Sequence, residues 1–404
     1  MFDTHAALSE VLAGVDDLTV DLDPGVAARL AASGDRTLVP RVQAAMERFL
    51  DEGNFYGVEV LADVLAGILG TRAFPLLLRA SARPLGHDWD SLIGLLGQLM
   101  DADPAGCRPT ARLFATERHP DLRLAGLWAL GYVVTADDLD LLGAALRDAD
   151  PHVRQIALGS VGSLRGDARV LPAVLEALRD PDPAVRGTAV LTVGDVGDLG
   201  ALDSLLALRR DPSPRVRSLL GHATGQLIAP GWGPPRTPPG PAQVETAVAA
   251  LVDLLADPDR EVRVGAVQGL GMIGGPSAVG ALIALADDPD AAIRAAVAFA
   301  LGTLAAPDTV ATLRVLARDE AAQVRSELVT ALGRPGRPEA VPLVVALAAD
   351  PDPDVRVRAA AAIGRLDDTA ALDTVRRLAA DDPEPRVRRT AAAVLARQAA
   401  SAPA

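Results

Sequence analysis

The chain has 404 residues, half of them hydrophobic, and 53 acidic side chains against 39 basic ones give it a net charge of −14. This balance argues against a general nucleic-acid-binding surface and against docking on an anionic membrane, because phosphate affinity requires a basic face. Cys107 is the only cysteine, which excludes an internal disulfide and a multi-cysteine metal site. Residues 1–20 contain acids and no long apolar run, so we expect no secretory signal, no transmembrane span and a cytoplasmic location.

Residues 1–110 have helical patterns but lack the motif that repeats after them. The segments 58–70 and 91–100 resemble second helices of degenerate repeats, and Leu92 lies 31 residues before Arg123, the first arginine of that motif. The terminal units of a stacked architecture are often atypical because they cap its exposed end. We therefore predict an N-terminal helical cap with about three degenerate repeats here.

From residue 117 onward, an arginine recurs at intervals of 31 or 32 residues, with one interval of 46. A bulky aliphatic residue precedes each arginine, an acid stands six residues before it, and a glycine stands eight residues after it in eight of nine copies. The arginines are Arg123, Arg154, Arg186, Arg217, Arg263, Arg294, Arg325, Arg356 and Arg388. A fixed period of this length predicts stacked supersecondary units rather than one closed core.

Each part of the motif has a mechanical reason. The pairs Asp182-Pro183 and Asp352-Pro353 predict a capped helix N-terminus with proline at its first position, and Ser213 is expected to cap with its hydroxyl. The glycine either ends that helix in a left-handed conformation or lets the next unit approach closely. Apolar segments that predict a first helix precede the motif at 170–178, 201–208, 248–255, 279–285, 310–316 and 341–347. The predicted unit is helix, turn, helix.

The strings at 180–194 and 350–364, D-P-x-P-x-V-R-x-x-A-x-x-x-x-G, resemble the HEAT-repeat family, in particular its short bacterial, phycobilin-lyase-type repeats. The resemblance extends from Glu117 to about Ala396. It implies an all-α, right-handed α-solenoid of about nine clear repeats. We divide the chain into an N-terminal part (1–110), repeats (111–227), a proline-rich loop (228–243) and further repeats with a C-terminal cap (244–400).

The recurring arginines could form an anion-binding ladder or a structural one. We favour the structural interpretation, in which each arginine bonds turn residues within or between neighbouring units. A shared structural need explains every copy, whereas a ligand would need only some of them.

The long interval contains the proline-rich stretch 228–243, which cannot be helical. Trp232 lies within it. The segment is either a surface loop whose tryptophan packs back on the solenoid, or a flap or docking segment over a binding surface.

HEAT-type solenoids present their second helices on the concave face, so the sides of these helices that packing does not use are candidate binding positions. Counted from the arginine, positions +1, +2, +5 and +9 point away from the core at 100° per residue. They contain an unexpectedly apolar stripe with two polar members: Trp128, Tyr132, Ile156, Leu191, Leu219, His222, Gln268, Met272 and Phe299. Exposed apolar patches mark partner or ligand sites. The alternative is a helix phase off by one residue, which would make these side chains ordinary core.

No residue pattern predicts catalysis, a metal or a cofactor. None of the five histidines is followed by glutamate, so the His-Glu pairs of HEAT-like metal-dependent hydroxylases are absent, and there is no P-loop, G-x-S-x-G or Rossmann fingerprint. The cluster His87-Asp88-Trp89-Asp90 aligns with a turn, which we favour over a site. Cys107 is expected to be a buried structural thiol.

Two functions remain. The favoured one is a scaffold or adaptor, without chemistry of its own, that binds a protein or peptide along the concave face. The alternative is an atypical HEAT-fold enzyme or accessory subunit acting on a groove-bound peptide, pigment or nucleic acid. It includes a DNA-glycosylase-like role for Trp128 and Asp195, which the negative charge disfavours, and a phycobilin-lyase-like role.

Overall fold

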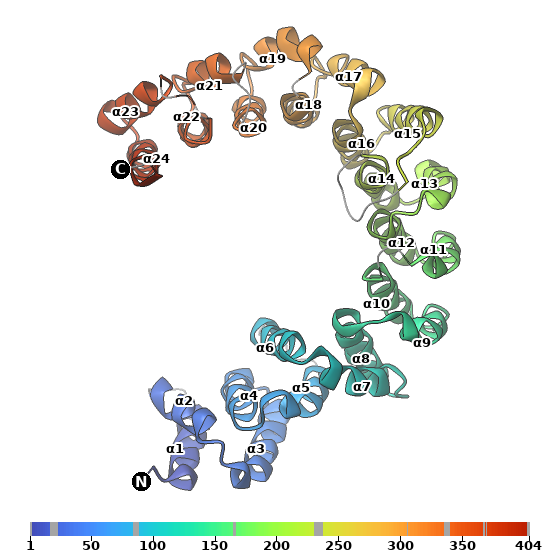
Figure 1. The fold of residues 1–404 in the computed structure, drawn as a ribbon, viewed down its shortest axis with the longest axis vertical. Helices are drawn as coiled ribbons and strands as arrows, with labels where there is room; N and C mark the ends of the chain where they lie inside the picture. Colours follow the sequence, from blue (N-terminus) through green and yellow to red (C-terminus); the bar gives the residue numbers. More distant parts are fainter. Residues whose placement is uncertain are drawn as a thin grey trace. The chain divides into compact units, whose positions relative to one another are not determined.

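The computed structural model describes residues 2–16, 23–83, 89–164, 167–229, 237–304, 306–334, 340–366, 368 and 370–401. Every regular element in these ranges is helical. The helices form two compact units, residues 1–173 and 174–404, which are described separately (Figure 1). The predicted all-α solenoid is confirmed. The boundary at residue 173 lies inside a helix, and the domain divisions expected at 110, 227 and 243 stay predictions.

The N-terminal unit is built from ten helices of the described chain and the start of an eleventh. They are α1 (Thr4–Asp16), α2 (Pro24–Ser33), α3 (Val39–Glu52), α4 (Phe55–Leu69), α5 (Phe74–Ser81), α6 (Trp89–Ala102), α7 (Pro104–Ala115), α8 (Pro120–Val133), α9 (Leu139–Ala145) and α10 (Pro151–Gly162). Helix α4 packs on α2 and α3, and α8 packs on α7 and α10. The segments 58–70 and 91–100 fall in α4 and α6, which are helical as expected.

The C-terminal unit repeats one helical hairpin. Its helices are α11 (Leu171–Ala177), α12 (Pro183–Val196), α13 (Leu202–Ala207), α14 (Pro214–Ile228), α15 (Pro241–Leu254), α16 (Arg260–Ile273), α17 (Gly275–Ile283), α18 (Ala291–Leu304), α19 (Val310–Leu316), α20 (Ala322–Leu332), α21 (Val341–Leu347), α22 (Pro353–Ile363), α23 (Leu372–Asp381) and α24 (Pro385–Ser401). Each even-numbered second helix packs on the next one. Within this unit they form the inner row, and the odd-numbered first helices form the outer row (Figure 1).

The turns cap the second helices largely as the sequence predicts. The Asp182 carboxylate accepts hydrogen bonds from the backbone N–H groups of Ala184 and Val185, and Asp352 accepts one from Asp354. The prediction for Ser213 is wrong. It occupies the N-cap position, but its hydroxyl makes no cap hydrogen bond. The backbone N–H of Ser213 donates to the Asp211 carboxylate. Asp211, the acid six residues before Arg217, therefore stabilises this turn.

The motif arginine joins each turn to the next one. In Arg325, Nε and a terminal nitrogen donate to both carboxylate oxygens of Asp350, at 2.6 and 2.8 Å. The other terminal nitrogen donates to the backbone carbonyls of Asp319 and Glu320 in the arginine's own turn. The same bidentate pair recurs as Arg186–Asp211, Arg217–Asp257, Arg294–Asp319 and Arg356–Asp382. The structural interpretation of the arginines is confirmed, and we call this series the Arg–Asp ladder.

The aspartates of the ladder have two partners each. Asp350 also accepts a hydrogen bond from the N–H of Asp352, which closes its own turn. The two charged side chains are buried, with 10% of Arg325 and 4% of Asp350 exposed. Hydrogen bonds from Arg294 hold the pKa of Asp319 below its ordinary value, and Arg356 does the same for the pKa of Asp382.

The recurring glycine serves close approach rather than helix termination. A Cβ on Gly302 would lie 2.8 Å from the Cβ of Ala331, and one on Gly271 would lie 2.7 Å from that of Ala300. Neither glycine has a positive φ. The tightest contact joins α14 and α16, where a Cβ on Gly221 would lie 1.7 Å from the Gly265 carbonyl oxygen.

One described stretch, Phe55–Ser81, is long and apolar enough to cross a membrane by length and composition. It is not one continuous α-helix, because Gly70 at φ 58° separates α4 from α5. Leu61, Leu65 and Leu77 in this stretch are fully buried within the unit. These apolar residues therefore form protein core.

The ladder should carry a large share of the stability of the C-terminal unit. Arg325→Met leaves the Asp350 carboxylate buried without its partner, so we expect a loss of about 3 kcal/mol in unfolding free energy by urea titration. Arg314→Met, on the exposed side of α19, removes an equal charge and should change stability by less than about 0.5 kcal/mol. Equal losses in the two variants would contradict the ladder's role.

Stability should also fall in acid. Asp319 and Asp382 have folded-state pKa values below the ordinary value, so they stabilise the fold fully above about pH 4. That contribution is lost as the pH falls through the lowered pKa values. Urea unfolding at steps from pH 7 to about pH 3 should show constant stability above about pH 5 and a decline below pH 4. A flat profile down to pH 3 would refute this account.

Gly221→Ala tests the contact of α14 with α16. The added methyl group meets backbone rather than a movable side chain, so we expect a loss of about 3 kcal/mol in thermal or urea unfolding. Gly280→Ala in α17 is the matched control, because its Cβ has no neighbour within 4 Å. The control should be neutral or slightly stabilising.

Candidate functional site

In the second helices, the buried and exposed positions are those that the sequence predicts. Val185 and Ala189, at positions −1 and +3, are buried, while Leu191 at position +5 is exposed. All nine residues of the predicted apolar stripe are exposed or half-exposed. The alternative that makes all of them ordinary core is therefore wrong, although the side chains of Leu219 and Met272 also contact the preceding repeat. Their role in binding stays a prediction.

Three members of the stripe belong to the N-terminal unit. Trp128 and Tyr132 lie one turn apart on α8, with ring centroids 5.1 Å apart and planes tilted by 59°. Tyr132 is 57% exposed. Ile156 is half-exposed on α10, which packs against α8. These residues form a small aromatic and aliphatic surface on neighbouring second helices.

The C-terminal unit has an open cavity of about 830 Å³ on its second helices, which we call the inner cavity. It contains four residues of the predicted stripe: His222 from α14, Gln268 and Met272 from α16, and Phe299 from α18. Phe299 is 36% exposed. Leu191 and Leu219 lie on α12 and α14 outside the lining. The Leu219 side chain instead lies against α12, 3.3 Å from where a Cβ of Gly187 would be.

Sequence reasoning missed the small and charged residues of the inner cavity. Ala292, Ala295 and Ala296 on α18 leave the space beside Phe299 open, and Glu327 and Arg334 come from α20 and its C-terminal end. Alanine is frequent in these helices, so an alanine at any one position does not predict a cavity. The depth depends on small side chains from several helices, which the spacing within one helix does not show.

The charges of the inner cavity are sparse. Glu261 is paired with the neighbouring Arg260 at 3.1 Å, and both are exposed. Within the described part of the chain, neither Glu327 nor Arg334 forms an ion pair. No group of three potential metal ligands occurs among the described residues. The lining is mostly apolar, amide and methyl groups, which suits binding of a partly apolar segment.

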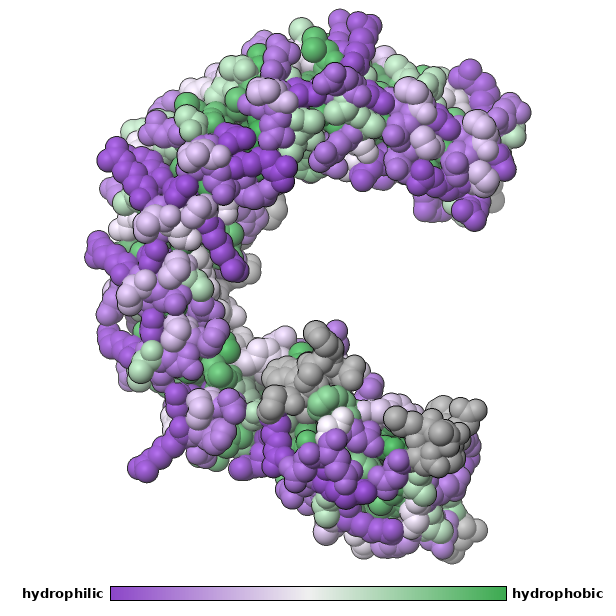
Figure 2. Space-filling view, turned by 180° about the vertical axis from the view of Figure 1, so that it is seen from behind, coloured by the Kyte–Doolittle hydropathy of each residue, from purple (hydrophilic) through white to green (hydrophobic). Residues whose placement is uncertain are grey.

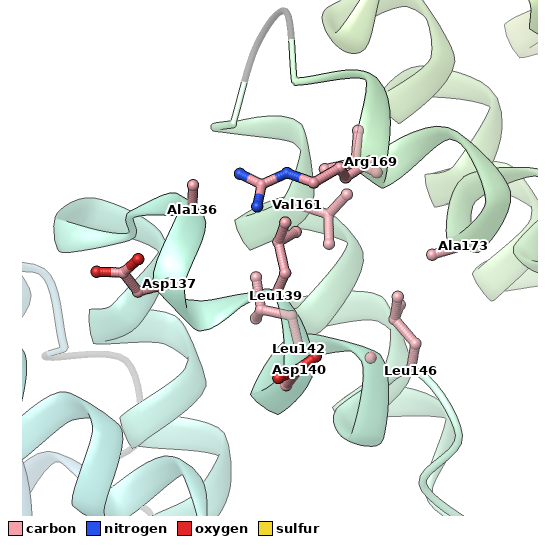
Figure 3. Close-up of a pocket in the computed structure, with 11 residues that line it drawn as sticks. Ala136, Asp137, Leu139, Asp140, Leu142, Leu146, Val161, Arg169 and Ala173 are labelled. Carbon is pink, nitrogen blue, oxygen red and sulfur yellow. The ribbon is translucent and has the colours of Figure 1, made fainter.

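A second cavity, of about 560 Å³, lies in the N-terminal unit beside α9 and a 3-10 turn, η4 (Ala168–Val170) (Figure 3). Leu139, Leu142 and Val161 form its apolar part. Arg169 at its edge is held by Asp167 at 2.6 Å. The cavity is a hollow between successive hairpins, away from the predicted stripe.

The remaining candidates add no chemistry. Cys107 is buried, and burial together with the charge of Asp103 raises the pKa of its thiol to about 11, so the nucleophilic thiolate is suppressed. The buried structural thiol is confirmed. His87, Asp88 and Trp232 lie outside the described residues, so the flap stays a prediction. Trp89 and Asp90 begin helix α6, so the turn expected for this cluster is wrong in its second half.

The sequence of the hairpins that carry the Arg–Asp ladder matches a known family. A family model for HEAT repeats matches residues 139–224, 248–322 and 311–396, which together make up more than half of the chain. The chain belongs to the HEAT-repeat family. No curated protein sequence matches this HEAT-repeat protein.

One solved structure supports the fold, and two others are more distantly similar. Importin beta in an ammonium sulfate condition has a TM-score of 0.55 at 14% identity, over 97% of this chain and 62% of importin beta. The karyopherin Kap121p bound to the extreme C-terminus of the phosphatase Cdc14p has a TM-score of 0.48 at 15% identity, over 89% and 44% of the two chains. The CpcE–CpcF complex of phycocyanin lyase from Nostoc sp. PCC7120 has a TM-score of 0.38 at 19% identity, over 56% and 86%.

Proposed function

We propose that this HEAT-repeat protein is a scaffold or adaptor that binds a polypeptide segment along its second helices, with the inner cavity as the main contact. The observation that carries the proposal is the exposed position of Phe299, beside the partly exposed Met272, in an open cavity of about 830 Å³. A cavity of this size accommodates one or two large side chains. Large exposed apolar groups at such a place are typical of binding surfaces.

The proposal concerns binding rather than chemistry. Aromatic and methionine side chains supply apolar contact area and adapt to varied partners. His222, Gln268 and Glu327 add hydrogen-bonding groups around that apolar floor. Trp128 and Tyr132 offer a second contact surface of the same kind in the N-terminal unit. We propose a cytoplasmic location as part of this function.

A displayed library of random peptides of about twelve residues, selected on the immobilised full-length protein, tests the proposal. We expect enriched peptides that share an apolar residue and compete with one another. Phe299→Ala should weaken the binding of the enriched peptides about tenfold, as removal of a central aromatic contact does. It should change the unfolding free energy by less than about 1 kcal/mol, because the side chain is partly exposed.

Val315→Ala is the matched control, since Val315 is 58% exposed on the outer helix α19. It should leave peptide binding unchanged. Trp128→Ala measures the contribution of the N-terminal unit in the same assay. No enrichment on the intact protein, or equal binding by the Phe299 and Val315 variants, would reject the inner cavity as the binding site.

A further inference from the structure

The last three repeats carry an arginine that the earlier repeats lack. The ninth position after the ladder arginine is, in order, Tyr132, Ser163, Asp195, Gln226, Met272, Thr303, Arg334, Arg365 and Arg397. We call the final three the arginine row. All three are exposed. Met272 of the inner cavity occupies the same repeat position on α16. The arginine row therefore continues from the inner cavity along successive second helices toward α24.

The fold does not require an arginine at this position in every repeat. Cations are favoured at helix C-termini, and Arg334 and Arg365 follow the ends of α20 and α22. The second helices α16 and α18, however, have Met272 and Thr303 at the equivalent place. Arg365 donates from Nε to the carbonyl oxygen of Gly333 at 2.9 Å, which fixes its position without neutralising its charge. No carboxylate in the described part of the chain forms an ion pair with Arg334 or Arg365.

Two more arginines reinforce the positive charge of this surface. Arg358 and Arg389 are exposed on α22 and α24, at positions +2 and +1. The exposed acid Asp354 is already bound to Arg386 at 2.6 Å. The end of the unit around α22 and α24 is strongly hydrophilic in Figure 2. A local basic surface in a chain of net charge −14 favours an acidic partner by charge complementarity.

We infer that the arginine row binds acidic side chains of the same polypeptide whose apolar residue occupies the inner cavity. This inference rests on the proposed function and specifies its ligand. Guanidinium groups bind carboxylates through paired hydrogen bonds. Packed helices lie about 8–10 Å apart and an extended chain advances about 3.3 Å per residue. The ligand should therefore have an acid at about every third residue, starting about three residues from an anchor beside Phe299 on α18 or about six from one beside Met272 on α16.

The displayed library on the full-length protein tests this directly, with three targets: the wild type, the row variant Arg334→Gln/Arg365→Gln/Arg397→Gln, and the control variant Arg314→Gln/Arg318→Gln/Arg377→Gln. The control removes the same charge from exposed positions of the first-helix side. We expect anchored peptides with acids at every third residue from the wild type and the control. The row variant should bind these peptides about tenfold more weakly. Thermal unfolding checks that all three targets are folded.

A second measurement does not depend on the variants. The affinity of the wild type for a selected acidic peptide should fall severalfold between about 0.05 and 0.5 M salt, because these charge pairs are exposed. Its Glu→Gln counterpart should bind more weakly and show little salt dependence.

Each other outcome has a definite meaning. Anchored peptides without acids, or equal binding of acidic peptides by the row variant and the wild type, overturn the inference and leave the proposed function standing. No enrichment on any target rejects both. A single-stranded oligonucleotide of equal charge that displaces the selected peptide and binds more tightly through the arginine row would assign the surface to nucleic acid and overturn the inference.

Discussion

The buried ion pair that joins five of the motif arginines to the aspartate of the next turn is the interaction on which the stack depends. Burial of two charges is costly unless every hydrogen-bonding group is used. Arg325 meets this condition by binding both oxygens of Asp350 and two carbonyls of its own turn. Asp350 in addition holds the N–H of Asp352. One pair therefore sets the turn, the start of the second helix and the spacing to the next hairpin, which together fix which side of that helix faces outward.

This dependence explains which features the sequence predicts well. The ladder repeats, so the period, the helix order and the helix phase follow from many copies of one pattern, and the burial of Val185 against the exposure of Leu191 confirms the phase. The inner cavity could not be predicted in the same way. Its depth depends on Ala295 and Ala296 beside Phe299, and on four helices meeting at one place. The failed cap at Ser213 is not explained by the ladder, because Asp350 holds the N–H of Asp352 just as Asp211 holds that of Ser213, and Asp352 still caps its helix.

The long interval shows how local the constraints are. Although 46 residues separate Arg217 from Arg263, Arg217 still binds Asp257 at 2.7 Å, and α14 packs closely on α16 through Gly221 and Gly265. An insertion is tolerated because each repeat contacts only its neighbours. Helix α14, which ends at the insertion, and helix α16 also line the inner cavity. The closest helix–helix contact in the unit, between α14 and α16, thus lies beside the inner cavity. The backbone beneath this cavity is therefore tightly packed.

The residues that hold the fold and the residues proposed to bind a partner occupy different repeat positions on the same helices. Ladder positions are mostly buried and repeat, while positions +5 and +9 are exposed or partly exposed and vary from Met272 and Phe299 to Arg334 and Arg365. Substitution at these outward positions changes little of the packing, so each repeat can acquire its own contact without loss of the fold. The acidic remainder of the surface adds selectivity. At physiological salt the field of an exposed charge decays over about 8 Å, so the arginines attract a carboxylate only at close range. A long polyanion would also meet the repulsion of the surrounding acids, and a short acidic segment would largely avoid it.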